Sequence, residues 1–245
     1  MNASPPTGHP LREVLLVWGA LFALFVPLGA AGRHYGVEEW TGVAMAVLLV
    51  ATAVHMARRD PDGPDRYALD LGGVLIAPED DRGLIPTIRR GIPSALRETA
   101  FALLVALVVF PPFALGYWLW HAPQQPFRLR WPDDTLGFAL SQLLVVGVSE
   151  EAFFRGYVQT RLTDRWPARA RLLGAGISVP ALVVQSALFA LVHLATDAHP
   201  QRLATFFPGL LFGWMRARRG GIGAAVVLHG LSNVYSATLD ESWLR

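Results

Sequence analysis

The sequence contains no cysteine. This absence excludes disulfides, thiolate catalysis and lipid anchors carried by cysteine. Lysine is absent as well, so all 21 basic side chains are arginine, a bias that we attribute to a GC-rich genome. The formal net charge is only +2, which is too small for the basic surface that nucleic-acid binding requires. We therefore expect no nucleic-acid partner.

Charged residues are scarce. They make up 16% of the chain, and 53% of the residues are hydrophobic, whereas a soluble domain carries about 25% charged residues. The first residues, MNASPPTGHPLRE, lack the short apolar core and the cleavage site of a secretory signal peptide. We expect the first apolar run to be a retained membrane anchor.

Apolar runs of about 20 residues, the length that crosses a bilayer, predict about seven transmembrane helices, within a range of six to eight. The Pro111–Pro112 pair should kink or split the third. We expect residues 58–94 to form a polar loop in which 71–78 lies at the membrane interface. The predicted fold is an all-α membrane helix bundle formed by one domain, 1–245, with its catalytic core at 135–239. The expected spans cover residues 14–31, 40–57, 95–120, 135–162, 179–196, 203–215 and 221–239.

The arginines predict the orientation, because cytoplasmic loops are enriched in positive charge. With the N-terminus in the cytoplasm and seven spans, the inner segments hold 15 arginines and the outer segments five. We predict a multi-pass protein of the bacterial inner (plasma) membrane with a cytoplasmic N-terminus. The inner arginines are Arg12, Arg58, Arg59, Arg66, Arg82, Arg89, Arg90, Arg97, Arg161, Arg165, Arg169, Arg171, Arg216, Arg218 and Arg219.

Three charged residues interrupt the fourth predicted span, in the stretch GVSEEAFFRGY. Each costs about 2.5–3.5 kcal/mol at the centre of a membrane helix if it is left unpaired. Glu151 and Arg155 are four residues apart with the acid first, the favourable order for an ion pair on one helix face. Glu150 lies about 100° further round the helix, and we expect its carboxylate to serve chemistry.

Further polar residues occur in later spans. Phe189 and His193 share one helix face, as do His229 and Asn233. We expect Glu150, His193, His229 and Asn233 to converge on a buried polar cavity, where small residues such as glycine let helices approach closely. The predicted boundaries place Glu150 near mid-membrane and His193 close to the outer end of its span.

These residue types fit amide-bond hydrolysis. A carboxylate and an imidazole can hold and deprotonate water, and a second imidazole with an amide can donate hydrogen bonds to the resulting oxyanion. Other hydrolytic schemes fit less well, since no HExxH zinc motif is present and the aspartates lie near the ends of spans. The sequence GVSE lacks the glycine that follows the serine of a rhomboid-type nucleophile, although spacing alone leaves Ser149 open.

The sequences EEAFFR, FALVH and HGLSN match the patterns EExxxR, FxxxH and HxxxN, in this order on successive spans. Together they resemble the CAAX-protease and bacteriocin-processing family of intramembrane endopeptidases, over roughly 135–239. The resemblance implies that Glu150 and His193 activate water and that His229 and Asn233 form the oxyanion hole. It assigns supporting roles to Glu151 and Arg155, and Phe189 completes the second motif. We favour a glutamate-type mechanism without metal, and a divalent ion such as zinc remains open.

We therefore predict an intramembrane endopeptidase whose partners are the lipid bilayer and a membrane-anchored protein or peptide substrate. The expected role is bacterial C-terminal processing or protein sorting, with a CAAX prenyl endopeptidase or a bacteriocin self-immunity protein as alternatives within the family. A proton- or ion-coupled transporter that uses the buried Glu and His is the alternative from another class. Transporters often contain inverted repeats, whereas here the polar residues gather in the C-terminal half and no repeat is visible.

Overall fold

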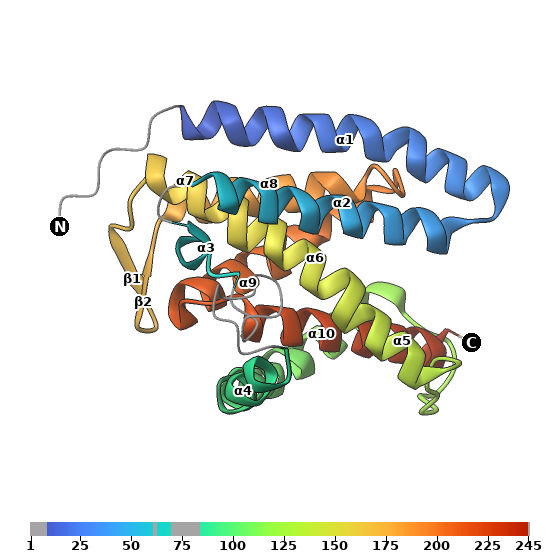
Figure 1. The fold of residues 1–245 in the computed structure, drawn as a ribbon. Helices are drawn as coiled ribbons and strands as arrows, with labels where there is room; N and C mark the ends of the chain where they lie inside the picture. The colour runs from blue at the N-terminus through green and yellow to red at the C-terminus, as the bar shows by residue number, and fades with distance from the viewer. Residues whose placement is uncertain (1–8, 61–62, 70–83, 245) are drawn as a thin grey trace. The chain divides into compact units, whose positions relative to one another are not determined.

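The computed structural model describes residues 9–60, 63–69 and 84–244 (Figure 1). They form helices and one small β-hairpin, which confirms the all-α class. Within this described part, four helices are long and apolar enough to cross a membrane, and Val179–His193 is a shorter apolar helix. The four long helices are Pro10–Tyr35, Glu38–Arg59, Arg89–His121 and Thr135–Arg165. The total of about seven spans stays a prediction.

The chain divides into two compact units, Met1–Asp70 with Ser149–Ile222, and Leu71–Val148 with Gly223–Arg245. The first unit begins with the antiparallel helices α1 (Pro10–Tyr35) and α2 (Glu38–Arg59), which lie side by side (Figure 1). Pro10 fits the first turn of α1, where a backbone N–H has no helical partner. Gly36, with φ of 66°, ends α1 in the left-handed conformation that glycine adopts without strain. A single turn, α3 (Gly63–Arg66), follows.

The rest of the first unit comes from the second half of the chain. Its helices are α6 (Val148–Glu151), the π-helix η2 (Ala152–Val158), α7 (Gln159–Arg165), α8 (Val179–His193), the 3-10 helix η3 (Pro200–Thr205) and α9 (Phe206–Arg219). The first residue of α6, Val148, is assigned to the second unit. The strands β1 (Ala170–Leu172) and β2 (Ala175–Ile177) pair antiparallel, with Leu172 opposite Ala175. Leu173 and Gly174 both have positive φ, which is typical of a tight two-residue hairpin turn.

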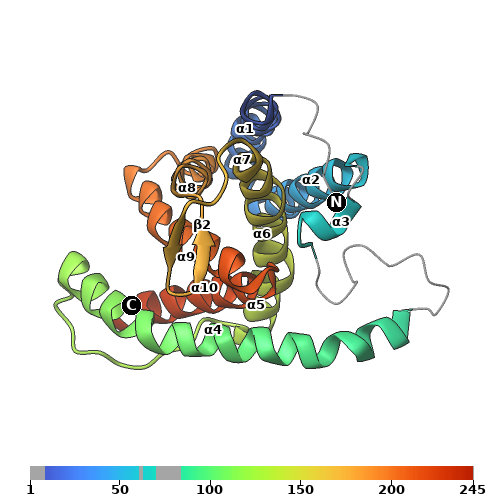
Figure 2. The ribbon, with the colours of Figure 1, turned by 90° about the vertical axis from the view of Figure 1, so that its left-hand side faces the viewer.

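The second unit consists of α4 (Leu84–His121), α5 (Thr135–Ser141), the π-helix η1 (Gln142–Gly147) and α10 (Gly223–Trp243). Helix α10 lies along α4 (Figure 2). The rings of Tyr235 and Phe110 stack with centroids 4.3 Å apart. Near the end of α10, Ser242 binds the loop that joins α4 to α5. Its backbone oxygen accepts a hydrogen bond from the backbone N–H of Arg128 at 3.1 Å, and its hydroxyl oxygen accepts one from the backbone N–H of Arg130 at 3.0 Å.

Four features of the helices and loops differ from the sequence prediction. Helix α4 passes through Pro111 and Pro112 without a break, so the pair does not split it; proline is tolerated within membrane helices because nearby groups satisfy the released carbonyls. The expected loop 58–94 is shorter, because α4 begins at Leu84. The fifth helix ends at His193 rather than at 196. The sixth is a 3-10 turn followed by α9. The interfacial segment 71–78 lies outside the described residues.

Candidate active site

The fourth predicted span is one helical run, Thr135–Arg165. It is not a uniform α-helix, because the π-helical segments η1 and η2 flank the single α-turn that carries Glu150 and Glu151. A π-helical turn contains an additional residue, and such turns are frequent at functional sites. The irregular winding was not predicted, since no sequence signal distinguishes a π-turn from an α-turn here.

Glu151 and Arg155 form the ion pair that their spacing predicts. The Nη1 atom of Arg155 lies 2.8 Å from Oε1 of Glu151, and both side chains are fully buried. Arg155 also donates to the carbonyl oxygen of Gly209 on α9 at 3.2 Å, and its guanidinium lies over the rings of Phe189 and Phe212. The pair therefore joins the charged helix to α8 and α9, and its partners offset part of the cost of burying two charges.

Glu150 and His193 face each other from α6 and α8. The Nε2 atom of His193 lies 3.9 Å from Oε2 of Glu150, and the two side chains are 20% and 19% exposed. This separation is too long for a direct hydrogen bond and suits a bridging water. On the other side of the ring, Nδ1 lies 2.7 Å from the carbonyl oxygen of Phe189. A carbonyl oxygen only accepts, so Nδ1 carries the proton, and in the neutral imidazole Nε2 is an acceptor directed toward Glu150.

The lengths of two helices explain why Glu150 and His193 lie at the same level. Asp164, near the end of α7, and Ser178, which caps α8, line one pocket. From this common level, 14 residues lead back to Glu150 and 15 lead forward to His193, so the two stretches contain nearly the same number of residues. The predicted span boundaries had placed the two residues at different depths, although a shared water requires one depth; in the structure α8 has only 15 residues and the two side chains meet.

His229 and Asn233 belong to the second unit, on α10. His229 is 5% exposed, and the Nδ2 atom of Asn233 donates to Oε1 of Gln142 at 2.8 Å. A β-carbon at Gly230 would lie 3.1 Å from the α-carbon of Leu143, so glycine allows α10 and η1 to approach closely. That these two residues meet Glu150 and His193 stays a prediction.

Several polar residues near these motifs were not predicted. Gln142 orients the Asn233 amide, as described above. In the first unit, Gln185 Nε2 donates to the carbonyl oxygen of Gly209 at 3.0 Å, and Gln159 Nε2 donates to that of Gly213 at 2.9 Å. Glutamine within an apolar span is the signal that could have drawn attention to all three. Glycine allows a close approach at Gly213, where a β-carbon would meet Leu182 and Gln185, whereas no described neighbour lies within 4 Å of a β-carbon at Gly221.

A metal ion needs several donor side chains, such as His, Asp and Glu, in one group. Among residues 9–60, 63–69 and 84–244, no three His, Asp or Glu side chains lie together in such a group. The side chains of Glu150 and His193 are of the kinds that bind zinc. A catalytic zinc site uses three protein ligands, so this pair would supply two of them. Ser149, which spacing left open as a nucleophile, is 3% exposed.

Part of the chain matches the model of a known protein family. Residues 132–235 match the family model described as "Type II CAAX prenyl endopeptidase Rce1-like". The matched range contains all three motifs found in the sequence. No curated protein and no solved structure matches the chain. The match confirms the resemblance to the CAAX-protease and bacteriocin-processing family over residues 132–235, and it indicates that this part of the chain is a membrane-embedded peptidase domain.

Proposed function

We propose that the protein is an intramembrane endopeptidase that hydrolyses a peptide bond of a membrane-associated protein. The observation that supports this most directly is the pair Glu150–His193, whose carboxylate oxygen and Nε2 atom are 3.9 Å apart. Both atoms are acceptors when Nδ1 holds the imidazole proton, so one water molecule can donate one hydrogen to each. Such a water has its oxygen lone pairs directed away from both residues, toward an incoming carbonyl carbon.

Catalysis then follows general-base chemistry. The Glu150 carboxylate takes a proton from the water while the water oxygen forms a bond to the carbonyl carbon, and the C=O electron pair moves to the carbonyl oxygen. When this oxyanion collapses, the C–N bond breaks, and the proton held by Glu150 passes to the leaving amine. His193 holds the water in position through Nε2. Glu151 and Arg155 position Glu150 by fixing the helix against α8 and α9.

In this proposal His229 and Asn233 stabilise the oxyanion. An amide nitrogen has two hydrogens, and the bond from Asn233 to Gln142 uses one of them. The second hydrogen is available for the substrate oxygen, and His229 is proposed as the other donor. Removing one donor of this kind typically costs about 10²–10³ in rate. The mechanism needs no metal, so activity should survive prolonged chelation; a loss that zinc restores would contradict this part.

We propose a bacterial substrate that is cut near a C-terminal membrane segment. This choice rests on the arginine-only composition and on the family match. The name of the matched family favours a prenylated C-terminus as the second candidate, and a self-immunity role is the third. The first two candidates are peptides attached to a membrane, which distinguishes them from soluble substrates.

The test compares membrane proteomes of strains that carry wild type, Glu150→Gln and the control Glu39→Gln. Glu39 lies in the first turn of α2 and is exposed, so its substitution removes the same charge away from the site. We expect a precursor with an uncleaved tail to accumulate only in the Glu150→Gln strain. If no precursor accumulates, the processing role is wrong. Proton or ion flux through wild-type protein in liposomes would instead favour the transporter.

A further inference from the structure

A second polar site lies in the first unit, where the ends of several helices meet. A pocket of about 300 Å³ is lined by residues of α3, α7, the β-hairpin and the end of α9. This volume is at the lower end of the range for ligand pockets. Two arginines line it, Arg66 and Arg216, together with hydroxyl and amide side chains that include Thr160, Ser178 and Gln159.

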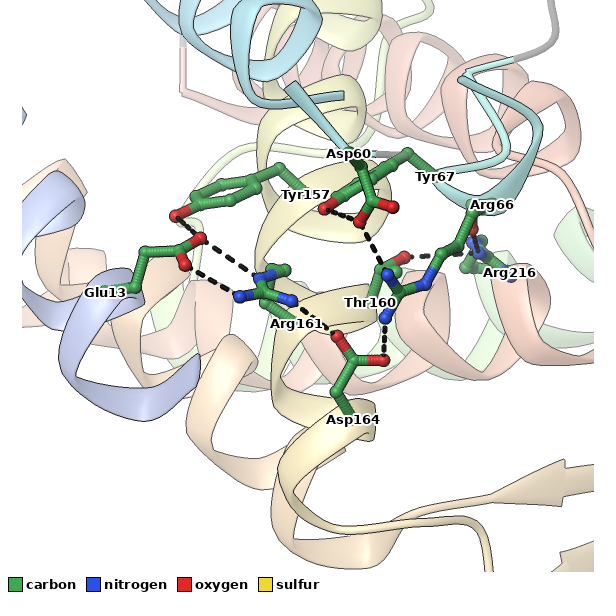
Figure 3. Close-up of polar contacts among 9 residues, drawn as sticks. All are labelled: Glu13, Asp60, Arg66, Tyr67, Tyr157, Thr160, Arg161, Asp164 and Arg216. Carbon is green, nitrogen blue, oxygen red and sulfur yellow. Dashed lines mark hydrogen bonds and ion pairs between the residues drawn. The ribbon is translucent and has the colours of Figure 1, made fainter. Parts of the chain in front are cut away.

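The charge of Arg66 is matched by neighbouring carboxylates. Its Nη1 atom lies 2.5 Å from Asp60, and Nη2 pairs with Asp164. Asp164 also pairs with Arg161 at 2.9 Å, and Arg161 pairs with Glu13 at 2.7 Å. Figure 3 shows these residues as one chain of contacts. Burial lowers the pKa of Arg66, but the hydrogen bond to Asp164 and the charges of Asp164 and Asp60 outweigh it, so the pKa is raised.

Within the part of the chain that the structure describes, Arg216 has no such compensation. Its guanidinium donates to the backbone oxygen of Arg66 at 3.5 Å and to the hydroxyl of Thr160 at 3.4 Å, both longer than a normal hydrogen bond. Its Nε atom is buried without an acceptor among the residues that the structure describes. Burial lowers its pKa, and no described carboxylate offsets this. In Figure 3 Arg216 and Glu13 lie at opposite sides of the network.

A guanidinium with unused donors at a pocket wall is a site for an anion. Its planar fork matches phosphate oxygens, which accept several hydrogen bonds. Asp164, which also lines the pocket, is occupied by two arginines. The hydroxyls of Thr160 and Ser178 can donate to the same anion.

The place of the pocket indicates the source of the phosphate. The ends of α7 and α9 and the start of α8 meet here, and the arginine distribution predicts that these ends face the cytoplasm. Basic pockets between membrane helices on that side suit anionic headgroups. We propose that the Arg216 pocket binds a phosphate group, supplied by an anionic phospholipid.

The test uses the full chain in nanodiscs of phosphatidylcholine with a small fraction of phosphatidylglycerol, and measures the lipid that stays bound after purification. We expect wild type to retain phosphatidylglycerol and Arg216→Gln to retain roughly tenfold less. Arg218→Gln is the matched control, because Arg218 belongs to the same helix end, is exposed and lies outside the pocket lining. Equal retention by the Arg216→Gln variant and wild type would overturn the proposal.

A second pair of variants works even if Arg216→Gln fails to fold. Ala168 lines the pocket and is exposed, so its replacement leaves the core intact. Ala168→Glu and Ala168→Gln have the same size and differ in charge. The proposal predicts a severalfold loss of bound lipid only in Ala168→Glu, and equal retention by both contradicts it. Inorganic phosphate separates the two sources: Arg216-dependent binding of millimolar phosphate to protein that retains no phosphatidylglycerol would support the phosphate site and overturn the lipid assignment.

Discussion

The guanidinium of Arg155 lies 4.2 Å from the ring centroid of Phe189, and the carbonyl oxygen of the same Phe189 binds the imidazole of His193. One phenylalanine therefore contacts both the buried ion pair and the proposed water-binding histidine. Its ring also meets the imidazole edge-on, with centroids 4.8 Å apart. The second motif, FxxxH, thus supports the arrangement of the first, EExxxR.

Glu151→Gln should strongly destabilise the protein. The substitution leaves the Arg155 charge fully buried without its carboxylate, which typically costs about 3–5 kcal/mol. Thermal unfolding of the purified protein in detergent measures the effect. Asp197→Asn is the control, because Asp197 pairs with Arg202 at 2.9 Å while both side chains are about half exposed, and exposed pairs contribute little. A melting temperature equally unaffected by both changes would contradict the structural role of the pair.

Gly230→Ala should weaken the second unit although alanine favours helices. The new β-carbon would lie 3.1 Å from the α-carbon of Leu143, and overpacking of this kind typically costs roughly 1–3 kcal/mol. Gly116→Ala in α4 is the control, since no described residue outside the helix's own backbone lies within 4 Å of a β-carbon at that position. There, the helix propensity of alanine should stabilise by up to about 1 kcal/mol. Opposite shifts of the melting temperature are expected, and a stabilised Gly230→Ala variant would exclude the close contact.

Gln142→Leu should lower kcat by roughly tenfold and leave KM nearly unchanged, because it removes the acceptor that orients the Asn233 amide without removing the amide itself. Asn233→Ala should cost more, about 10²–10³. Gln142→Glu retains an acceptor oxygen and should recover much of the activity. A Gln142→Glu variant as slow as Gln142→Leu would indicate that packing, rather than orientation of Asn233, is responsible.

The convergence of the two pairs of site residues can be tested by cross-linking, because the chain has no cysteine of its own. We expect the double variant Glu150→Cys with His229→Cys to be joined by a short bifunctional maleimide. Glu241→Cys replaces His229→Cys in the control, since position 241 lies 12 residues further along α10, roughly 18 Å. Cross-linking of the control alone would contradict a shared cavity.

The sequence predicted the features that depend on local spacing. The Glu151–Arg155 pair follows from the i,i+4 rule, and the long apolar runs correspond to helices. Tertiary features were harder to predict. The short α8 brings His193 close to Glu150. Its end was expected three residues later, because Leu194 and Ala195 continue the apolar pattern beyond His193. The Arg216 pocket is formed by residues more than 100 positions apart, such as Arg66 and Arg216, so no local pattern reveals it.

Cleavage of the accumulated precursor by purified protein in liposomes tests the central claim most directly. Wild type and Glu39→Gln should release the tail at equal rates, whereas Glu150→Gln, which cannot accept the proton of the water, should be at least about 10²-fold slower. His193→Ala should also be slow, while both variants keep the melting temperature of folded protein. Full-rate cleavage by folded Glu150→Gln protein would show that this carboxylate does not activate the water.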